Sequence, residues 1–407
     1  MTRIAIVGAS VGGVRTAQAL RRAGFSGHLT LIGAEPEVPY DKPPLSKAFL
    51  ADTEHKPTQL LTVQEAADVD IDLVLGHRAV RLDVAARQIE LEEHAPVEFD
   101  KLVIATGARA RRSPWPTQPG VHVLRTVEDA RDLRRDLHDG GHLAIVGAGF
   151  IGAEVAGTAR KLGLEVTLVD PLAVPAADLI GDEVGRRLIE LHSRNGVRTR
   201  LGLGVESLEQ AKDGRLVLTL TDGETVAADT VLVAIGATPN DEWLESSGLR
   251  VDDGVLCDEY SRVSRTPEIY AVGDVARWHH ETPGPSRRVE HWTNAVEQAT
   301  VVAHNLTHPE ELRPYTPVGY VWTDQHDWKI QIAGDPQSAQ ATVLVDQSDH
   351  HADRWAMLYH DVDDVLVGAV VVNWPRALIA SRRALQHPTS VVEVRDQLDR
   401  NPAAARS

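Results

Sequence analysis

A short apolar strand that runs into a glycine-rich turn occurs twice in this chain of 407 residues. The first copy, RIAIVGASVGG, covers residues 3–13, and the second, HLAIVGAGFIG, covers residues 142–152. A segment that recurs in this way is one supersecondary unit used more than once. Because apolar strands and helical patterns alternate after each copy, the repeat predicts two doubly wound α/β units, each built on a parallel sheet.

A second pair of matching strands follows these turns. FDKLVIATGA at 99–108 resembles ADTVLVAIGA at 228–237, and each of these strands ends on a glycine. A further apolar strand, 269–272, ends at Gly273 and Asp274, far beyond the second unit. We therefore expect a discontinuous first domain, 1–110 and 240–316, with a second domain, 111–239, inserted into it.

The pattern changes after residue 317. Short alternating segments at 329–332, 342–345, 356–359 and 365–372 precede a helical pattern at about 375–385. Strands that alternate in this way are typical of an antiparallel sheet with one solvated face. The sequence thus predicts a small α+β domain at 317–407.

Charge and cysteine content exclude several functions. The 42 Lys+Arg against 59 Asp+Glu leave a net charge of −17, which repels nucleic-acid phosphates and anionic membrane surfaces. The apolar run 365–374 is about ten residues, against the roughly 20 that span a bilayer. A single cysteine rules out a disulfide within the chain and is typical of a reducing compartment. We expect a cytoplasmic protein.

The second glycine-rich turn has the spacing of a dinucleotide-binding fingerprint. Gly147, Gly149 and Gly152 follow a strand and open a helix, and Asp170 ends the next strand. The glycines allow pyrophosphate to approach the helix N-terminus, where free N–H groups favour negative charge. Asp170 would bind the ribose hydroxyls and oppose a 2′-phosphate. This turn therefore predicts NADH rather than NADPH.

The first turn is a degenerate copy in which Ser10 replaces the middle glycine between Gly8 and Gly13. Glu35 ends the following strand at the position of the ribose acid. Thr106 and Gly107 end a later strand, and the motif TPEIYAVGD at 266–274 ends on Asp274, a candidate partner for a ribityl hydroxyl. Together these motifs favour FAD over a second nicotinamide.

At these residues the chain resembles the FAD- and NADH-dependent ferredoxin reductases that serve bacterial oxygenases and cytochromes P450. The resemblance covers nearly the whole chain and implies two dinucleotide-binding domains, for FAD and NAD, with a small C-terminal α+β domain, as in glutathione reductase. It rests also on the segments 39–47 (PYDKPPLSK), 147–154 (GAGFIGAE), 239–244 (PNDEWL), 289–298 (VEHWTNAVEQ) and 322–331 (WTDQHDWKIQ). Lys42 stands where the family usually has Arg, and His326 where it often has an aromatic residue.

The resemblance implies roles for individual residues. Lys47 would lie by flavin N5, paired with Glu154, and the two would frame the nicotinamide. The backbone of Glu290, His291 and Trp292 would meet the pyrimidine edge of the flavin. Asn294 is a good N-cap with Glu297 three residues later, so it predicts the start of a helix that points at the flavin. Trp322 is a candidate for flanking the flavin or for the electron exit.

The missing cysteines decide the expected reaction. Relatives that reduce disulfides or peroxides need a redox cysteine, and the segment 43–49 (PPLSKAF) contains none. Cys257 is expected to be structural. Electrons that arrive as hydride must therefore leave to an external acceptor, which in this family is a [2Fe-2S] ferredoxin. Flavin supplies the change from two-electron to one-electron transfer.

Two other functions stay open. A rubredoxin reductase shares the fold and differs in its acceptor, and a non-catalytic flavoprotein could sense NADH through a protein partner. An NADH oxidase or peroxidase is disfavoured by the missing cysteine. The chain could act as a monomer or as a homodimer.

Histidines and arginines suggest further sites. The pairs at 279–280 and 350–351 lack metal-ligand spacing, so we expect no metal. Local basic patches could steer an acidic ferredoxin despite the negative net charge. The candidate clusters are Arg109/Arg111/Arg112, Arg287/Arg288 and Arg382/Arg383.

Overall fold

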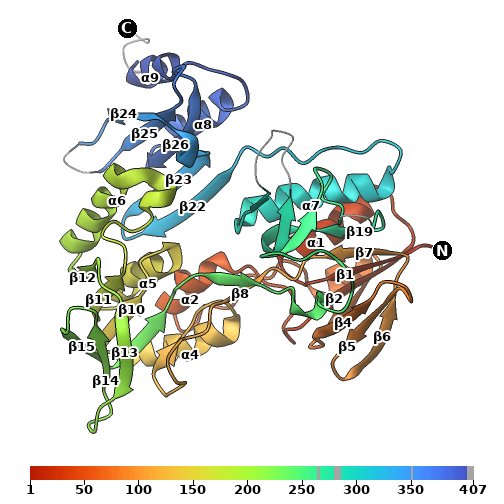
Figure 1. Ribbon diagram of the computed structural model, residues 1–407, viewed down its shortest axis with the longest axis horizontal. Coiled ribbons are helices and arrows are strands. Elements are labelled where there is room, and N and C mark those ends of the chain that lie inside the picture. The colour runs from red at the N-terminus through yellow and green to blue at the C-terminus, as the bar shows by residue number, and fades with distance from the viewer. Residues whose placement is uncertain (264–265, 279–285, 350–351, 401–407) are drawn as a thin grey trace. The chain divides into compact units, whose positions relative to one another are not determined.

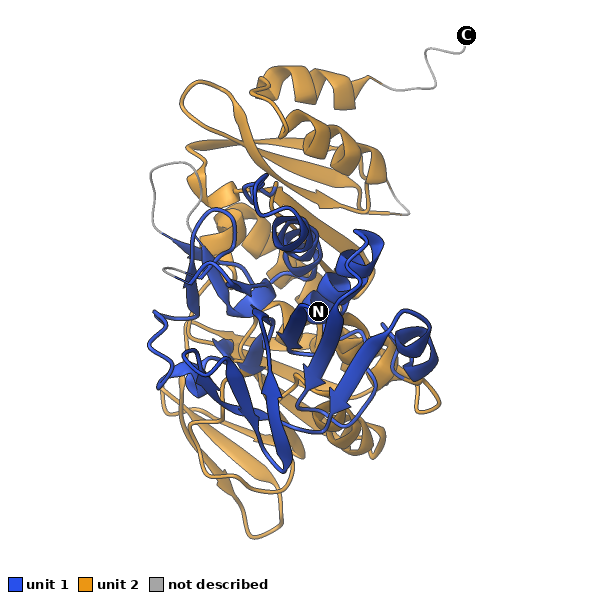
Figure 2. Cartoon of the chain, turned by 90° about the vertical axis from the view of Figure 1, so that its right-hand side faces the viewer, with its two compact units in different colours: residues 1–42, 57–109, 237–317 blue, residues 43–56, 110–236, 318–407 orange. Residues whose placement is uncertain are grey.

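A computed structural model of the chain describes residues 1–263, 266–278, 286–349 and 352–400. The histidine pairs 279–280 and 350–351 lie outside the described residues. Unit 1, one of two compact units, comprises 1–42, 57–109 and 237–317, and unit 2 comprises 43–56, 110–236 and 318–407 (Figure 2). Within the described ranges, no helix combines the length and apolarity that a bilayer crossing requires.

Unit 1 is built on a parallel five-stranded sheet in the order β19-β7-β1-β2-β3. Its strands are β1 (Arg3–Val7), β2 (His28–Gly33), β3 (Ile71–Leu75), β7 (Lys101–Ile104) and β19 (Ile269–Ala271). β19 follows the second unit in sequence yet pairs with β7, with Ile269 opposite Leu102. A segment beyond residue 236 thus completes the first sheet.

Helices α1 (Val11–Arg22) and α7 (Trp292–Thr307) lie side by side in unit 1 (Figure 1). Their apolar residues pack in one core with Ile4 and Ile6 of β1. Because side chains alternate along a strand, Ala5 and Val7 belong to a second core. A Cβ built at Gly12 would lie 3.7 Å from Cβ of Ala295, so small residues let the two helices approach closely.

The second core of unit 1 includes residues of two small sheets, such as Leu82, Ile89 and Val255. The first of these sheets contains β4 (Ala79–Asp83), β5 (Gln88–Leu91) and β6 (His94–Glu98), and the second contains β18 (Val255–Cys257), β20 (Ala276–Trp278) and β21 (Arg287–Arg288). A short helix, α3 (Val63–Asp68), begins with a capping box between Thr62 and Glu65. Strands β8 (Ala108–Ala110) and β17 (Ala237–Pro239) carry the chain between the units.

The predicted cap at Asn294 is wrong. The N-cap of helix α7 is His291, three residues before Asn294, and the helix begins at Trp292. The Asn294 side chain is buried, donates to the backbone oxygen of Val289 at 3.2 Å and accepts from the Tyr315 hydroxyl at 2.9 Å. This tertiary bridge replaces the local capping bond that the sequence pattern predicted.

Unit 2 contains a parallel sheet in the order β12-β11-β10-β16-β9. Its strands are β9 (Val121–His122), β10 (His142–Val146), β11 (Glu165–Asp170), β12 (Val197–Leu201) and β16 (Thr230–Val233). Its helices are α4 (Val127–His138), α5 (Phe150–Lys161) and α6 (Ala177–Arg194), and an antiparallel sheet is formed by β13 (Val205–Gln210), β14 (Leu216–Leu220) and β15 (Thr225–Ala228). Both glycine-rich turns therefore follow a strand of a parallel sheet, as predicted.

The C-terminal part of unit 2 is an antiparallel sheet in the order β22-β23-β26-β25-β24, as the alternation predicted. Its strands are β22 (Tyr320–Gln325), β23 (Trp328–Gly334), β24 (Ala341–Asp346), β25 (Trp355–His360) and β26 (Leu366–Val372), with helices α8 (Pro375–Ala384) and α9 (Val391–Asp399). Strand β22 and helix α9 are two elements that the sequence did not predict.

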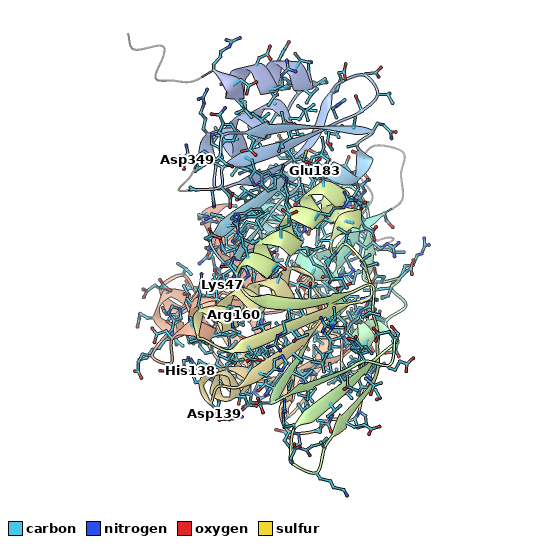
Figure 3. All side chains as sticks on the ribbon, turned by 90° about the vertical axis from the view of Figure 1, so that its left-hand side faces the viewer. Lys47, His138, Asp139, Arg160, Glu183 and Asp349 are labelled. Atoms are coloured by element: carbon cyan, nitrogen blue, oxygen red, sulfur yellow. The ribbon has the colours of Figure 1, made fainter. Side chains whose placement is uncertain are left out.

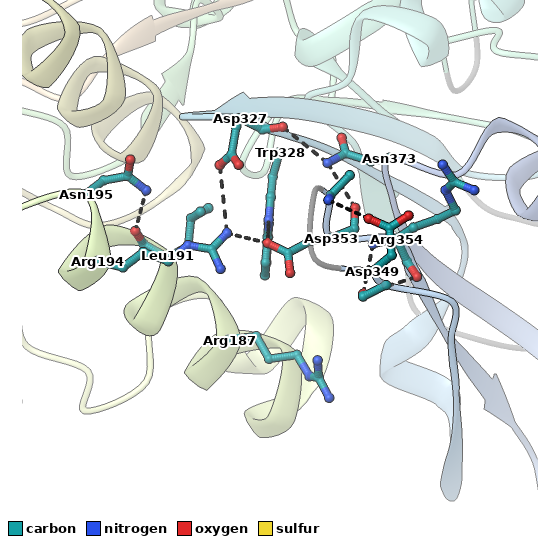
Figure 4. A network of polar contacts seen from close by, with 12 residues as sticks. Arg187, Leu191, Arg194, Asn195, Asp327, Trp328, Asp349, Asp353, Arg354 and Asn373 are labelled. Carbon is teal, nitrogen blue, oxygen red and sulfur yellow. Dashed lines mark hydrogen bonds and ion pairs between the residues drawn. The ribbon is translucent and has the colours of Figure 1, made fainter.

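A polar and aromatic network fastens this sheet to α6 (Figure 4). Arg194 of α6 pairs with Asp353 and stacks over Trp328, 5.3 Å from the ring centroid. The Trp328 indole N–H donates to the same carboxylate at 2.7 Å. Burial opposes ionisation of Asp353, but the hydrogen bonds from Arg194 and Trp328 hold its pKa below the usual value. The pair is thus ionised, which fixes the sheet against α6 across the physiological pH range.

The segment 43–56 packs within unit 2. It forms a 3₁₀ turn, η1 (Pro43–Ser46), and a short helix, α2 (Ala48–Ala51), with Lys47 between them. The Arg134 guanidinium lies 4.2 Å from the ring centroid of Phe49, and His138 contacts the backbone oxygen of Leu50 at 3.1 Å. Figure 3 labels Lys47 of this segment and His138 of α4. Helix α4 thereby fixes the segment that carries Lys47.

Candidate active site

The turn after β1 admits only glycine at two positions. Gly8 has φ +122°, and a Cβ there would lie 2.0 Å from the backbone oxygen of Ala105. A Cβ at Gly13 would lie 1.9 Å from the backbone oxygen of Gly8. Ser10 begins α1 and makes no side-chain capping bond to any described residue. The first N–H groups of α1 are therefore available to an anion such as a pyrophosphate.

Three further predicted residues follow the ends of neighbouring parallel strands in the same unit. Glu35 comes after β2, Thr106 after β7 and Asp274 after β19. Since the carboxyl ends of parallel strands meet at one edge of a sheet, these residues and the turn after β1 share that edge. The structure thus brings together most of the residues that the sequence assigned to FAD.

The side chains of Glu35 and Thr106 are held by other residues of unit 1. The Glu35 carboxylate accepts from the Tyr40 hydroxyl and from Nζ of Lys42, the latter at 2.9 Å. Thr106 Oγ1 donates to the backbone oxygen of Asn240 at 2.7 Å, and Gly107, at φ +64°, accepts from the backbone N–H of Asn240 at 2.9 Å. The Thr106–Gly107 turn is therefore held rigidly.

Residues 290–292 lie at the start of α7. Glu290 pairs with Arg288, and the Trp292 indole N–H donates to Asp41 at 2.8 Å. Nδ1 of His291 is buried and has no hydrogen-bond partner in the described part of the chain. Burial lowers the pKa of His291, although the charge of Asp274 opposes this. An orphaned buried nitrogen at a helix start, together with the open α1 terminus, fits a polar cofactor such as FAD in unit 1.

The turn after β10 repeats this construction in unit 2. A Cβ at Gly147 would lie 2.3 Å from the backbone oxygen of Ala234, and one at Gly152 would lie 2.0 Å from that of Gly147. A Cβ at Gly149, by contrast, would have no described atom within 4 Å. The middle glycine thus borders open space at the N-terminus of α5. This geometry fits a pyrophosphate group.

Asp170 lies at the end of β11 and is 8% exposed. Its Oδ2 accepts from the backbone N–H of Ala148 at 2.7 Å, and its Oδ1 accepts from that of Leu172 at 2.8 Å. A carboxylate has about four acceptor positions when ionised, and the hydrogen bonds within the described residues use two of them. Its binding to ribose stays a prediction.

Glu154 is at the centre of a buried polar cluster in unit 2. The side chain is 4% exposed, and Nζ of Lys47 lies 2.7 Å from its Oε2. The Ser46 hydroxyl also donates to Oε2. On the other oxygen, Oε1, the Thr323 hydroxyl donates at 2.8 Å and the backbone N–H of Asp324 at 3.3 Å. These contacts fix the Glu154 carboxylate from both oxygens, and Oε2 in turn holds the Lys47 ammonium in one direction.

Sequence reasoning missed Ser46, Thr323 and Asp41. Ser46 and Thr323 bind Glu154 from segments far away in sequence, and Asp41 binds Trp292. All three lie inside or next to segments that carried the family resemblance, which is the signal that could have pointed to them.

The remaining candidates differ in exposure. Cys257 is 1% exposed, and burial raises the pKa of its thiol far above the usual range. The Arg288 side chain is 11% exposed and is held by Glu290 and Asp253. A role of Arg287/Arg288 in steering a ferredoxin stays a prediction. Arg382 and Arg383, by contrast, are exposed in the last turn of α8.

Among the described residues, no three His, Cys, Asp or Glu side chains are grouped as metal ligands.

Comparison with known families matches two models to this chain. Residues 2–299 match the pyridine nucleotide-disulphide oxidoreductase model, and residues 320–401 match the reductase C-terminal model. Two parallel sheets with glycine-rich turns and a small C-terminal α+β region are the fold of a two-dinucleotide-domain oxidoreductase. The chain belongs to the pyridine nucleotide-disulphide oxidoreductase family, whose ferredoxin reductases use FAD and NADH.

Individual proteins resemble the chain along almost its whole length. Rhodocoxin reductase of Rhodococcus erythropolis is 38% identical over 390 residues, 94% of this chain and 89% of that protein. The ferredoxin–NAD(+) reductase component of the p-cumate 2,3-dioxygenase system of Pseudomonas putida is 38% identical over 393 residues, 96% and 95% of the two chains. The ferredoxin reductase for the CYP199A2 system of Rhodopseudomonas palustris superposes with a TM-score of 0.91 at 31% identity, covering 100% of both chains. The predicted family and fold class are confirmed.

Proposed function

We propose that this protein is an FAD-containing, NADH-dependent ferredoxin reductase. Hydride passes from NADH to FAD, and electrons then leave singly to a [2Fe-2S] ferredoxin that supplies an oxygenase or a cytochrome P450. Bound FAD supplies the conversion from two-electron to one-electron transfer. The names of the relatives, which are reductase components of oxygenase systems, support this assignment.

One observation carries the choice of acceptor. The family name includes disulphide reductases, but this chain has a single cysteine, and that thiol is buried with a raised pKa. A protonated, inaccessible thiol is neither a nucleophile nor a redox relay. Electrons therefore have no thiol to go to in this chain and must pass to another molecule.

The chain's own residues divide the work. FAD would be held by Gly8, Ser10, Gly13, Glu35, Thr106, Gly107, Asp274, Glu290, His291 and Trp292, with Lys47 also assigned to it by the family resemblance. NADH would be held by Gly147, Gly149, Gly152, Glu154 and Asp170. Lys47 and Glu154 are the residues that we assign to hydride transfer, in which Glu154 fixes the direction of the Lys47 ammonium.

We further assign the FAD domain to 1–110 and 240–316, the NAD domain to 111–239 and the C-terminal domain to 317–407. We place the protein in the cytoplasm, where reducing conditions suit a chain with one free thiol. Its direct partner is the ferredoxin, and the oxygenase or cytochrome P450 is reached through it.

A panel of electron acceptors tests the proposal. Purified protein should release FAD on denaturation and should reduce [2Fe-2S] ferredoxins with NADH much faster than rubredoxins. Faster turnover with rubredoxin would make the protein a rubredoxin reductase. Rapid peroxide-dependent loss of NADH would instead indicate a peroxidase, and slow flavin reduction with no iron–sulfur acceptor would indicate an NADH sensor.

A further inference from the structure

Strand β22 and His326, the residue that follows it, contact helix α5 at three positions that share one helix face. Glu154, Gly157 and Lys161 are spaced i, i+3, i+7, so their side chains point the same way. Thr323 donates to Glu154, and Nζ of Lys161 donates to the backbone oxygen of His326 at 2.8 Å. A Cβ at Gly157 would lie 2.9 Å from the backbone nitrogen of His326. Close packing and a hydrogen bond therefore fix the distance between β22 and α5.

The hydrogen of the Thr323 hydroxyl has one direction available. Thr323 is fully buried, at 0% exposure, and its Oγ1 accepts a long contact of 3.4 Å from Nε2 of Gln325. A hydroxyl has a single hydrogen to donate. Since the oxygen accepts from Gln325, the hydrogen is left for Oε1 of Glu154, which lies 2.8 Å away.

The Thr323 hydroxyl controls the orientation of the Glu154 carboxylate. The terminal torsion of a glutamate is broad, so a carboxylate held on one oxygen alone can rotate. Thr323 holds Oε1, while Lys47 lies 2.7 Å from Oε2. With both oxygens held, Oε2 stays aimed at the Lys47 ammonium. Among the described residues, loss of the Thr323 hydroxyl leaves on Oε1 the longer 3.3 Å bond from the backbone N–H of Asp324.

We propose that Thr323 is a positioning residue for the reduction of the flavin by NADH. It acts through Glu154, whose carboxylate it orients toward Lys47. The inference rests on the proposed function, which assigns the Lys47–Glu154 pair to hydride transfer. It gives the C-terminal part of the chain a role in the NADH half-reaction, separate from any role in meeting the ferredoxin.

Three single variants test this role in stopped-flow reduction of the holoenzyme by NADH. Thr323→Val keeps the shape of the side chain and removes the O–H, so the saturating reduction rate should fall about tenfold, with less than a twofold change in the NADH dissociation constant. Thr323→Ser keeps the hydroxyl and should stay within about twofold of wild type. The matched control Thr230→Val makes the same change at a buried strand position of the same unit and should also stay within about twofold.

A second readout does not depend on turnover. Labelling of Lys47 by an amine-reactive reagent, followed by peptide mass spectrometry, should be about threefold faster in Thr323→Val, because the ammonium is held less firmly. Labelling in Thr230→Val should match wild type. In a Lys47→Met background, Thr323→Val should slow flavin reduction no further. If Thr323→Val does not fold, Thr323→Ala serves for the same measurements.

The experiments distinguish a failure of the Thr323 role from a failure of the proposed function. Wild-type reduction and labelling in Thr323→Val, or an equal loss in Thr323→Ser, would overturn the positioning role and leave the ferredoxin reductase proposal standing. If NADH reduces the flavin but no ferredoxin takes the electrons, the proposed function fails, while the reduction rates of the variants still decide the role of Thr323.

Discussion

The backbone N–H of Ala148 donates a 2.7 Å hydrogen bond to Oδ2 of Asp170, which ties the acid at the end of β11 to the glycine-rich turn after β10. The carboxylate assigned to the NADH ribose therefore also organises the backbone of that turn. A substitution at Asp170 has two separable consequences, one on coenzyme choice and one on the geometry of the turn.

Replacing Asp170 with Ser should weaken the binding of NADH about tenfold. It should also narrow the preference for NADH over NADPH, because the charge that opposes a 2′-phosphate is lost. Loss of the two backbone hydrogen bonds should also destabilise the protein by about 1–3 kcal/mol. Steady-state kcat/KM for both coenzymes and a denaturant titration measure the two effects. The control is Asp178→Ser, at an exposed acid in the first turn of α6. An unchanged coenzyme preference would mean that another residue reads the ribose.

Glu154→Ala should slow flavin reduction by NADH by roughly 10- to 100-fold, because the orientation of reacting groups supplies much of the rate in such a step. Lys47→Met should slow the same half-reaction. FAD content should change little in both variants, which absorbance after denaturation reports. Lys56→Met, at an exposed lysine of the same segment, is the matched control. Loss of FAD in Glu154→Ala would make Glu154 structural, and wild-type rates in both variants would remove the pair from the site.

Cys257→Ala should leave ferredoxin turnover unchanged, since the thiol is buried and donates to the backbone oxygen of Val255 at 3.3 Å. The native protein should also resist an aromatic disulfide reagent until it is unfolded. A variant that keeps its FAD but loses most of its turnover would reveal a redox role for the thiol.

The fold and much of the candidate site follow from local pattern. Glycine at Gly13 and Gly152 is dictated by collisions with the backbone oxygens of Gly8 and Gly147, each earlier in the same turn, which a motif records directly. Strand β22 escaped prediction although it alternates, with Val321, Thr323 and Gln325 all buried. Its buried positions include polar residues, so its hydrophobic periodicity is weak.

The rest of the site depends on contacts between distant segments. The Asn294 cap failed because Tyr315 and Val289 bind its side chain instead, and neither contact belongs to a capping pattern. Thr323 meets Glu154 only because β22 lies along α5, and no local rule specifies that packing. The sequence therefore indicated which elements carry the candidate site residues. The hydrogen-bond donors that orient those residues come from distant segments and depend on tertiary structure.

Acid should destabilise the protein through a pair of histidines in unit 2. His192 and His326 lie 3.0 Å apart, Nδ1 to Nε2. Burial and then repulsion from His326 lower the pKa of His192 to about 4. Burial and then the charges of Lys161, Arg194 and Arg160 lower that of His326 to about 4.

Below about pH 6.5 these two histidines bind more protons in the unfolded chain than in the folded protein. The free energy of unfolding should therefore fall as the pH drops from about 6.5 toward 4. In His326→Asn, chosen because this position has φ +55°, the drop in melting temperature between pH 7 and pH 5 should be smaller by roughly 2–4 °C. His308→Asn, at an exposed histidine, should keep the wild-type slope. Equal slopes in His326→Asn and wild type would contradict the assignment.

The ferredoxin partner raises an electrostatic problem, because this chain carries a net charge of −17 and an acidic partner would be repelled at long range. A local basic patch solves it. Arg382 lies 4.7 Å from the ring centroid of Tyr320, which stacks on Trp322 at 6.1 Å. An exposed cation thus lies at one end of a row of aromatic rings that includes the candidate electron exit.

Charge reversal at this cluster decides between steering and apolar docking. Arg382→Glu combined with Arg383→Glu should raise the apparent KM for ferredoxin about tenfold and leave flavin reduction by NADH intact. The double change affects the association with ferredoxin and not the hydride-transfer step. Turnover with ferredoxin should also fall as salt rises above about 0.1 M, where the Debye length is roughly 10 Å, while small artificial acceptors respond little. The matched control is Arg22→Glu, an exposed arginine in the last turn of α1. Turnover that rises steadily with salt, together with a silent double reversal, would favour an apolar contact in which Trp322 takes part.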